Sequence, residues 1–117
     1  MQHDKDALLA ACRRISRDMD ERPAIRTAGL AALQRLLPIA LNDTGQSRVI
    51  ARFLLGLYNG QGYPFDLTEF RLLDGELFDD CLAVLRMDYN PEREVHEYLA
   101  NGHEVFAKLR RCHGSTR

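Results

Sequence analysis

Hydrophobic side chains recur at steps of three and four residues along most of the chain, the period of an amphipathic helix. The first stripe predicts a helix from about Asp4 to Asp20. Pro23 predicts that this helix ends before it, because the residue preceding a proline is steered away from helical backbone angles. We expect the stripe to face other helices in a shared core. Its members are Leu8, Leu9, Cys12, Ile15 and Met19.

A second helix is predicted from Ala24 to about Leu41, with Pro23 in its first turn. Gly29, Ala31 and Ala32 supply small side chains, which would let another helix approach closely. Pro38 lacks an amide and crowds the preceding turn, so the pattern predicts either a kink or a stop at that position. The apolar stripe comprises Ile25, Ala28, Leu33, Leu36, Leu37 and Ala40.

The segment 42–60 is the most informative part of the chain, because it contains a helix start, an apolar face and a helix stop. Asp43 or Thr44 would cap the helix, and Asn59-Gly60 would end it. The predicted buried face comprises Val49, Ile50, Phe53, Leu54 and Leu57. We expect this helix to be central in the fold.

In the second half, Asp66 and Glu69 have the spacing of a capping box, and Phe65 could pack on Phe70 as a hydrophobic staple. A short helix through Leu73 is expected. A longer helix should follow, capped by Asp74 and buried through Leu77, Phe78, Cys81, Leu82, Leu85 and Met87.

Asn90-Pro91 resembles a cap followed by a first-turn proline, and an apolar periodicity then continues to Leu109. Residues 91–112 could form one helix or two. We prefer one, with Gly102 facing a close neighbour. No segment alternates with the period of a strand, so the sequence predicts an all-α single domain, a bundle of five or six helices over residues 1–112. Residues 113–117 are expected to form a disordered basic tail.

The net charge is −1, but the charges are unevenly distributed. Residues 66–97 contain three Lys/Arg against ten Asp/Glu, a balance of −7, while the segments before and after each carry +3. This acidic block indicates either solvated helix faces or a docking surface for a basic partner, including a mimic of nucleic-acid charge. The chain has no apolar run long enough for a membrane span and a polar start, which predicts a cytoplasmic protein.

Three widely spaced cysteines fit neither a disulfide framework nor a zinc site. We expect Cys12 and Cys81 to be small core residues and Cys112 to be exposed. His96 and His103 are seven residues apart, or about 10.5 Å along one helix, so they could not share a metal ion. Glu92 and His96 would form a surface pair. No catalytic, cofactor-binding or metal-ligating motif is present, and we expect a non-enzymatic protein without a cofactor.

A polar stripe opposite the buried face of the 44–59 helix is the candidate interaction site. Gly56 motivates it, since glycine weakens an exposed helix by up to ~1 kcal/mol unless something approaches closely. The stripe could receive an acidic helix of another protein or of a second copy. Its residues are Gln46, Arg48, Arg52, Gly56 and Asn59, with Gly45 at its start.

Residues 41–58 also resemble a helix-turn-helix, with Gln46, Ser47, Arg48 and Arg52 toward base edges. A recognition helix normally belongs to a basic domain, whereas this chain is nearly neutral. A small DNA-binding regulator is therefore the alternative to the protein-interaction module.

Four strings resemble those of a family of small uncharacterised proteobacterial proteins, whose members are often encoded on plasmids, prophages or integrative elements. The strings are Asp43-Thr44-Gly45-Gln46-Ser47-Arg48, Phe53-Leu54-Leu55, Phe65-Asp66-Leu67-Thr68 and Leu73-Asp74. The resemblance covers roughly residues 30–110 and departs after Tyr89. It implies an accessory protein that acts by binding, and it implies no activity.

Overall fold

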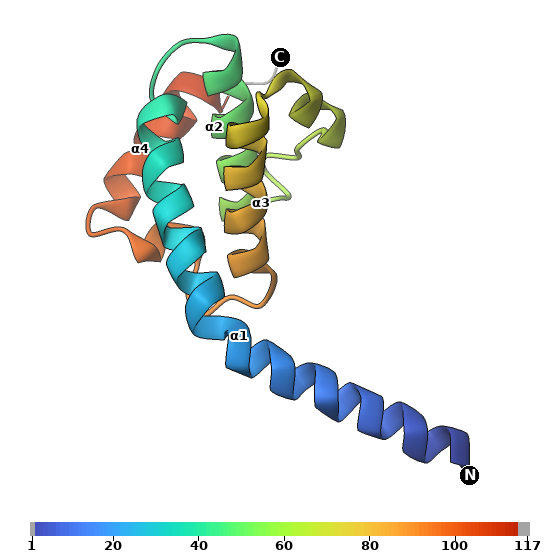
Figure 1. The fold of residues 1–117 in the computed structure, drawn as a ribbon. Helices are drawn as coiled ribbons and strands as arrows, with labels where there is room; N and C mark the ends of the chain where they lie inside the picture. Colours follow the sequence, from blue (N-terminus) through green and yellow to red (C-terminus); the bar gives the residue numbers. More distant parts are fainter. Residues whose placement is uncertain (1, 115–117) are drawn as a thin grey trace.

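The computed structural model describes residues 2–114, and within that range it contains four α-helices, two short 3-10 helices and no strand (Figure 1). The predicted all-α fold is confirmed. The helices are α1 (Gln2–Ala40), α2 (Gly45–Tyr58), η1 (Leu67–Leu72), α3 (Gly75–Tyr89), η2 (Val95–Tyr98) and α4 (Gly102–His113).

The predicted break at Pro23 is wrong, because α1 runs through it as one helix of 39 residues. A proline inside a helix removes one backbone hydrogen bond and bends the helix without necessarily ending it. The Thr27 hydroxyl donates to the Pro23 carbonyl at 2.9 Å, a contact that favours bending. Figure 1 shows α1 changing direction where its first half leaves the rest of the molecule.

Pro38 lies in the last turn of α1, which ends two residues later at Ala40. Of the two outcomes that the sequence allowed at Pro38, a kink or a stop, the structure shows the helix ending just beyond the proline. The Leu41 amide donates to the Leu37 carbonyl, so one further turn closes before the chain reverses toward α2.

One core joins the second half of α1 to α2, α3 and α4, with α2 packed between α1 and α4 (Figure 1). The predicted buried face of α2 is confirmed for Val49, Ile50, Phe53 and Leu54, while Leu57 is half-buried. This single core makes one domain. It is formed by Ala32, Leu33, Leu36, Ala40, Ile50, Ala51, Phe53, Leu54, Leu55, Cys81, Val84, Val95, Phe106 and Leu109.

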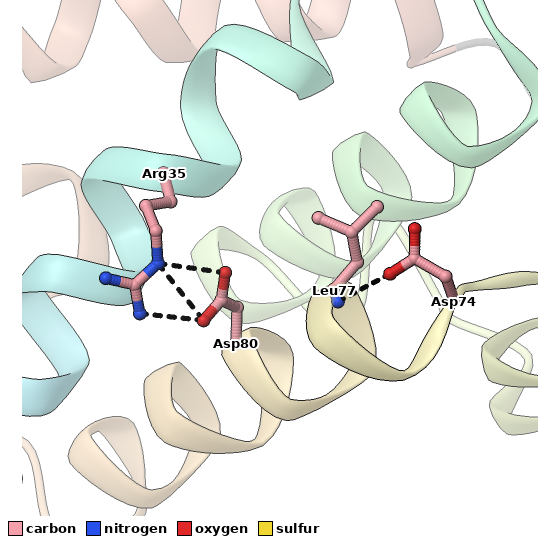
Figure 2. Close-up of polar contacts among 4 residues, drawn as sticks. All are labelled: Arg35, Asp74, Leu77 and Asp80. Atoms are coloured by element: carbon pink, nitrogen blue, oxygen red, sulfur yellow. Dashed lines mark hydrogen bonds and ion pairs between the residues drawn. The ribbon is translucent and has the colours of Figure 1, made fainter.

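The predicted helix starts at 44 and 74 are confirmed. The Thr44 hydroxyl accepts from the Ser47 amide at 3.0 Å, and the Asp74 carboxylate accepts from the Leu77 amide at 2.9 Å (Figure 2). These bonds satisfy amides that have no partner inside the helix. Phe65 packs on Phe70 with ring centroids 5.0 Å apart, as the staple predicts.

Asp66 caps η1 as predicted, but the capping box with Glu69 does not form. The Asp66 carboxylate accepts from the amide and hydroxyl of Thr68, two residues on. These hydrogen bonds lower the pKa of Asp66. Glu69 instead receives a hydrogen bond from Arg52.

The buried stripe of α3 is rotated from its predicted position. Cys81, Val84 and Met87 are buried, whereas Leu82 and Leu85 are exposed. Both stripes have helical spacing, so periodicity alone could not choose between them.

The single helix preferred for residues 91–112 is wrong, and so is the helix start at Asn90-Pro91. Asn90 follows the end of α3, and η2 begins only at Val95. A Cβ on Gly102 would lie 2.7 Å from the His96 carbonyl carbon, so the chain folds back here in a way that needs glycine. α4 includes the buried His113, and residues 115–117 of the predicted tail lie outside the described residues.

Two arginines of α1 form ion pairs with carboxylates in the second half of the chain. The Arg35 guanidinium donates three hydrogen bonds to the oxygens of Asp80 on α3, at 2.8, 3.1 and 3.3 Å (Figure 2). Arg26 donates to Glu92 at 2.7 Å, which fixes the loop after α3 and lowers the pKa of Glu92. Both arginines are substantially exposed, so the pairs fix register more than they add stability.

Gly29 should be intolerant of a side chain. A Cβ there would lie 2.6 Å from the Met87 Cβ, so α1 and α3 would have to separate. We expect Gly29→Ala to lower the free energy of unfolding by about 1–3 kcal/mol in urea denaturation, despite alanine's better helix propensity. Gly75→Ala is the matched control, because nothing lies within 4 Å of that Cβ. Equal effects at both positions would contradict the close packing.

Asp88 should destabilise the fold at neutral pH. Partial burial raises its pKa, with a smaller contribution from the negative charge of Glu94. The folded state therefore binds this proton more tightly than the unfolded state, and stability falls as the pH rises through the raised pKa. We expect Asp88→Asn to stabilise the protein at pH 7 by less than about 1 kcal/mol, because the group is half-exposed.

The measurement is urea unfolding at several pH values, in which the gain of Asp88→Asn should vanish below the ordinary carboxyl pKa of 3.8. Asp79→Asn is the control, since it removes the same charge from an exposed position on the same helix. A gain that persists at low pH would show another cause.

Candidate functional site

The first half of α1, residues 2–22, is called the arm here, and it projects away from the body formed by the other helices (Figure 1). Every side chain from His3 to Arg17 is exposed. The predicted burial of its stripe is therefore wrong: Leu8 is 65 %, Ile15 61 % and Met19 68 % exposed. Cys12 is exposed as well. Periodicity shows that a helix has an apolar face, but not that the same chain covers it.

The arm stripe is defined as Leu8, Cys12, Ile15 and Met19. These residues are spaced by four, three and four, so they lie along one side of the helix. Leu9, at 52 % exposure, flanks the stripe. The stripe is a continuous apolar surface outside the core.

A hollow, called the elbow here, lies where the arm leaves the body. Its apolar wall includes Ile15 and Met19 of the arm and Tyr89 at the end of α3, which is 79 % exposed. Arg14, Arg17 and Arg86 also line it, with Asp18, Glu21 and Asn90. The arm stripe therefore continues into a concave surface rich in arginine.

Among the described residues, the arm and the body make only weak polar contacts across the elbow. The Asn90 amide donates to Asp18 at 3.3 Å, and Arg86 lies 3.9 Å from Glu21. Exposed contacts of this length contribute little to stability. They leave the apolar wall open.

The polar stripe predicted on α2 lies largely against the chain's own 59–74 segment. The Gln46 side-chain carbonyl accepts from the Asp74 amide at 2.7 Å, and Arg52 donates to Glu69 at 2.8 Å. The Asn59 side chain accepts from the Gly62 amide. Gly45 and Arg48 remain exposed, so the stripe is not the continuous exposed surface that was expected.

Gly56 allows a close approach, as predicted, but the segment that approaches it belongs to the same chain. A Cβ there would lie 3.3 Å from the Tyr63 carbonyl oxygen and 3.4 Å from the Phe65 Cβ. The loop after α2 is thereby packed against the helix. The glycine is explained by folding and needs no partner.

Four residues of α2 were predicted to face the base edges of DNA, and three of them are buried or held by other residues of the chain. Ser47 is buried, and Gln46 and Arg52 are held by Asp74 and Glu69. Arg48 is exposed and pairs with Asp43 at 3.0 Å. A DNA interface would therefore depend mainly on Arg48.

His96 and His103 lie side by side, with ring centroids 4.9 Å apart, so the separation expected from one helix is wrong. The fold-back before Gly102 brings them together. Glu92 pairs with Arg26, not with His96. Within residues 2–114 no group of three or more metal-ligating side chains occurs. The Nδ1 atom of His96 is buried without a hydrogen-bond partner against Tyr58 and Phe106.

The three thiols are free and differ in environment. Burial raises the pKa of Cys81 to about 12, which keeps it a neutral core residue as predicted. Cys12 and Cys112 are exposed. Cys12 is the thiol within the arm stripe.

Within the described range, no helix is both long and apolar enough to cross a membrane. The model of a family of unknown function, DUF7673, matches residues 30–114. No curated protein and no solved structure matches the chain. The matched segment contains residues 30–40 of α1 and all of α2 to α4, while the arm precedes it.

We expect the Arg52 side chain to stabilise the fold and the Arg48 side chain to contribute little to its stability. The Arg52–Glu69 pair is mostly buried and joins α2 to η1. We expect Arg52→Ala to lower the free energy of unfolding by about 1–2 kcal/mol, because Glu69 loses its partner. Arg48→Ala, the matched control on the same helix, should have almost no effect in urea denaturation. Equal losses would contradict this assignment.

Proposed function

The chain belongs to the DUF7673 family of unknown function, and we propose that it is a non-enzymatic helical module that binds another protein through the arm stripe and the elbow. The observation that carries this proposal is the exposure of Leu8, Ile15 and Met19 on one side of a helix. An accessory role in a mobile element rests on the sequence resemblance alone.

Two physical arguments support a protein partner. Contiguous exposed apolar surface with a polar rim is typical of protein interaction sites, and an amphipathic helix commonly binds through apolar residues at steps of three and four. The elbow adds one exposed tyrosine and three arginines, residue types that dominate binding energy at protein interfaces. The arm lies outside residues 30–114, so the surface is proposed for this chain and not for every family member.

Arg48 is a second, smaller candidate contact. It is the arginine of the α2 stripe that remains exposed, beside the exposed Gly45. Its pairing with Asp43 leaves little net charge for a partner. The arm stripe offers far more apolar surface.

The proposal is tested by affinity capture with the full chain and three variants. Leu8→Glu/Ile15→Glu should weaken capture of the specific partner by at least about 30-fold, because charges would replace the centre of the contact. Ala10→Glu is the matched control, since Ala10 is exposed on the opposite side of the arm. Arg48→Ala tests the α2 stripe.

Circular dichroism should show that all variants remain folded, because the substituted side chains lie outside the core. A partner lost only with Arg48→Ala would assign the contact to α2. A set of bound proteins that is the same for all four chains would overturn the proposal.

A further inference from the structure

We infer that the protein bound by the arm is a second copy of this chain, with the two arms packed antiparallel and the tip of each arm at the elbow of the other copy. This inference rests on the proposed function of the arm stripe. It adds the identity of the partner and the register of the contact.

The spacing of the arm stripe is the same in both directions. Leu8, Cys12, Ile15 and Met19 are separated by four, three and four residues. An antiparallel copy therefore places Leu8 against the partner's Met19 and Cys12 against the partner's Ile15, which gives four matched apolar layers. These alternating steps are those of a two-helix seam.

The helix dipoles favour the antiparallel direction. Antiparallel arms have opposed helix dipoles, whereas parallel arms have aligned dipoles that repel each other.

The shape of the molecule also favours this direction. Two packed helices have axes about 8–10 Å apart, whereas the molecule is 27 Å wide in its narrowest dimension. Parallel arms would bring both bodies to the same end and crowd them. Antiparallel arms place the bodies at opposite ends.

In this register Leu8 comes level with the partner's Met19, which lines the elbow together with Ile15 and Tyr89. The first turns of each arm therefore lie beside the elbow of the other copy, where the exposed Tyr89 ring offers further apolar surface.

The exposed apolar area is sufficient for a dimer of modest stability. Large side chains present on the order of 200 Å² each, so Leu8, Leu9, Ile15, Met19 and Tyr89 together expose roughly 600 Å² per copy. Two copies would bury about 1,200 Å², the lower end of stable interfaces. The stems of the flanking arginines would add to this area.

Disulfide trapping tests the partner and the register together. Leu8→Cys and Met19→Cys are made separately in a Cys12→Ser/Cys112→Ser background, with one of them extended by a tag that changes its mass. Mixing the two variants under mild oxidation should give a crosslinked heterodimer on a non-reducing gel. Each variant alone should give at least about tenfold less product, because antiparallel copies keep like positions several helical turns apart.

Light scattering of the unmodified chain provides the second measurement. At about 100 μM we expect a mass near twice the monomer value of 13.4 kDa. The Leu8→Glu/Ile15→Glu variant should stay monomeric, and Ala10→Glu should behave as the unmodified chain.

Four outcomes would overturn the inference. Crosslinking of each variant with itself would indicate parallel arms, and a mixture without crosslinks from a monomeric chain would exclude a second copy. A monomer that still captures a different protein through the arm would overturn this inference and leave the proposed function intact. Arm-dependent sedimentation with anionic lipid vesicles, without any protein partner, would overturn both.

Discussion

The close contact between α3 and the second half of α1 is the constraint on which the rest of the structure depends. Gly29 lets the Met87 side chain approach the backbone of α1. Farther along the same two helices, Arg35 forms an ion pair with Asp80. With α3 fixed, its first turn meets α2 through the Asp74 amide and Gln46. The same contact explains the elbow, because α3 ends at Tyr89 while α1 continues beyond it without a neighbouring helix.

Ion pairs within the molecule balance part of the uneven charge along the sequence. Arginines of the first 65 residues pair with carboxylates of the acidic block, in Arg26–Glu92, Arg35–Asp80 and Arg52–Glu69. Each pair joins segments far apart in the sequence. Exposed ion pairs add little free energy, but they disfavour packing arrangements that would oppose like charges. The acidic block is therefore in part an internal complement of α1 and α2, which weakens its interpretation as a docking surface for a basic partner.

Local features were predictable from the sequence, and arrangements that depend on distant contacts were not. Thr44 and Asp74 cap their helices as predicted, because a cap is settled within three residues. The helix end predicted at Pro23 is wrong, because a proline can bend a helix without ending it. At the candidate site, Gly56 correctly indicated a close approach. The segment that approaches it is the loop after α2 of the same chain, not a partner. The pairing of His96 with His103 required the fold-back at Gly102, which no periodicity indicates.

The arm differs from every other helix in how its helical form can be stabilised. Most helical stability in proteins comes from packing an apolar face rather than from intrinsic helix propensity. Asn90 and Arg86 of the body make weak polar contacts with Asp18 and Glu21 at the base of the arm, while its apolar side stays in solvent. A partner that covers Leu8, Ile15 and Met19 would supply the packing that the other helices obtain from the core. Formation of the arm helix and binding of the partner are then thermodynamically coupled, because each stabilises the other. The family match from residue 30 onward contains every residue of the core, whereas the arm lies outside it and adds an exposed apolar surface to this chain.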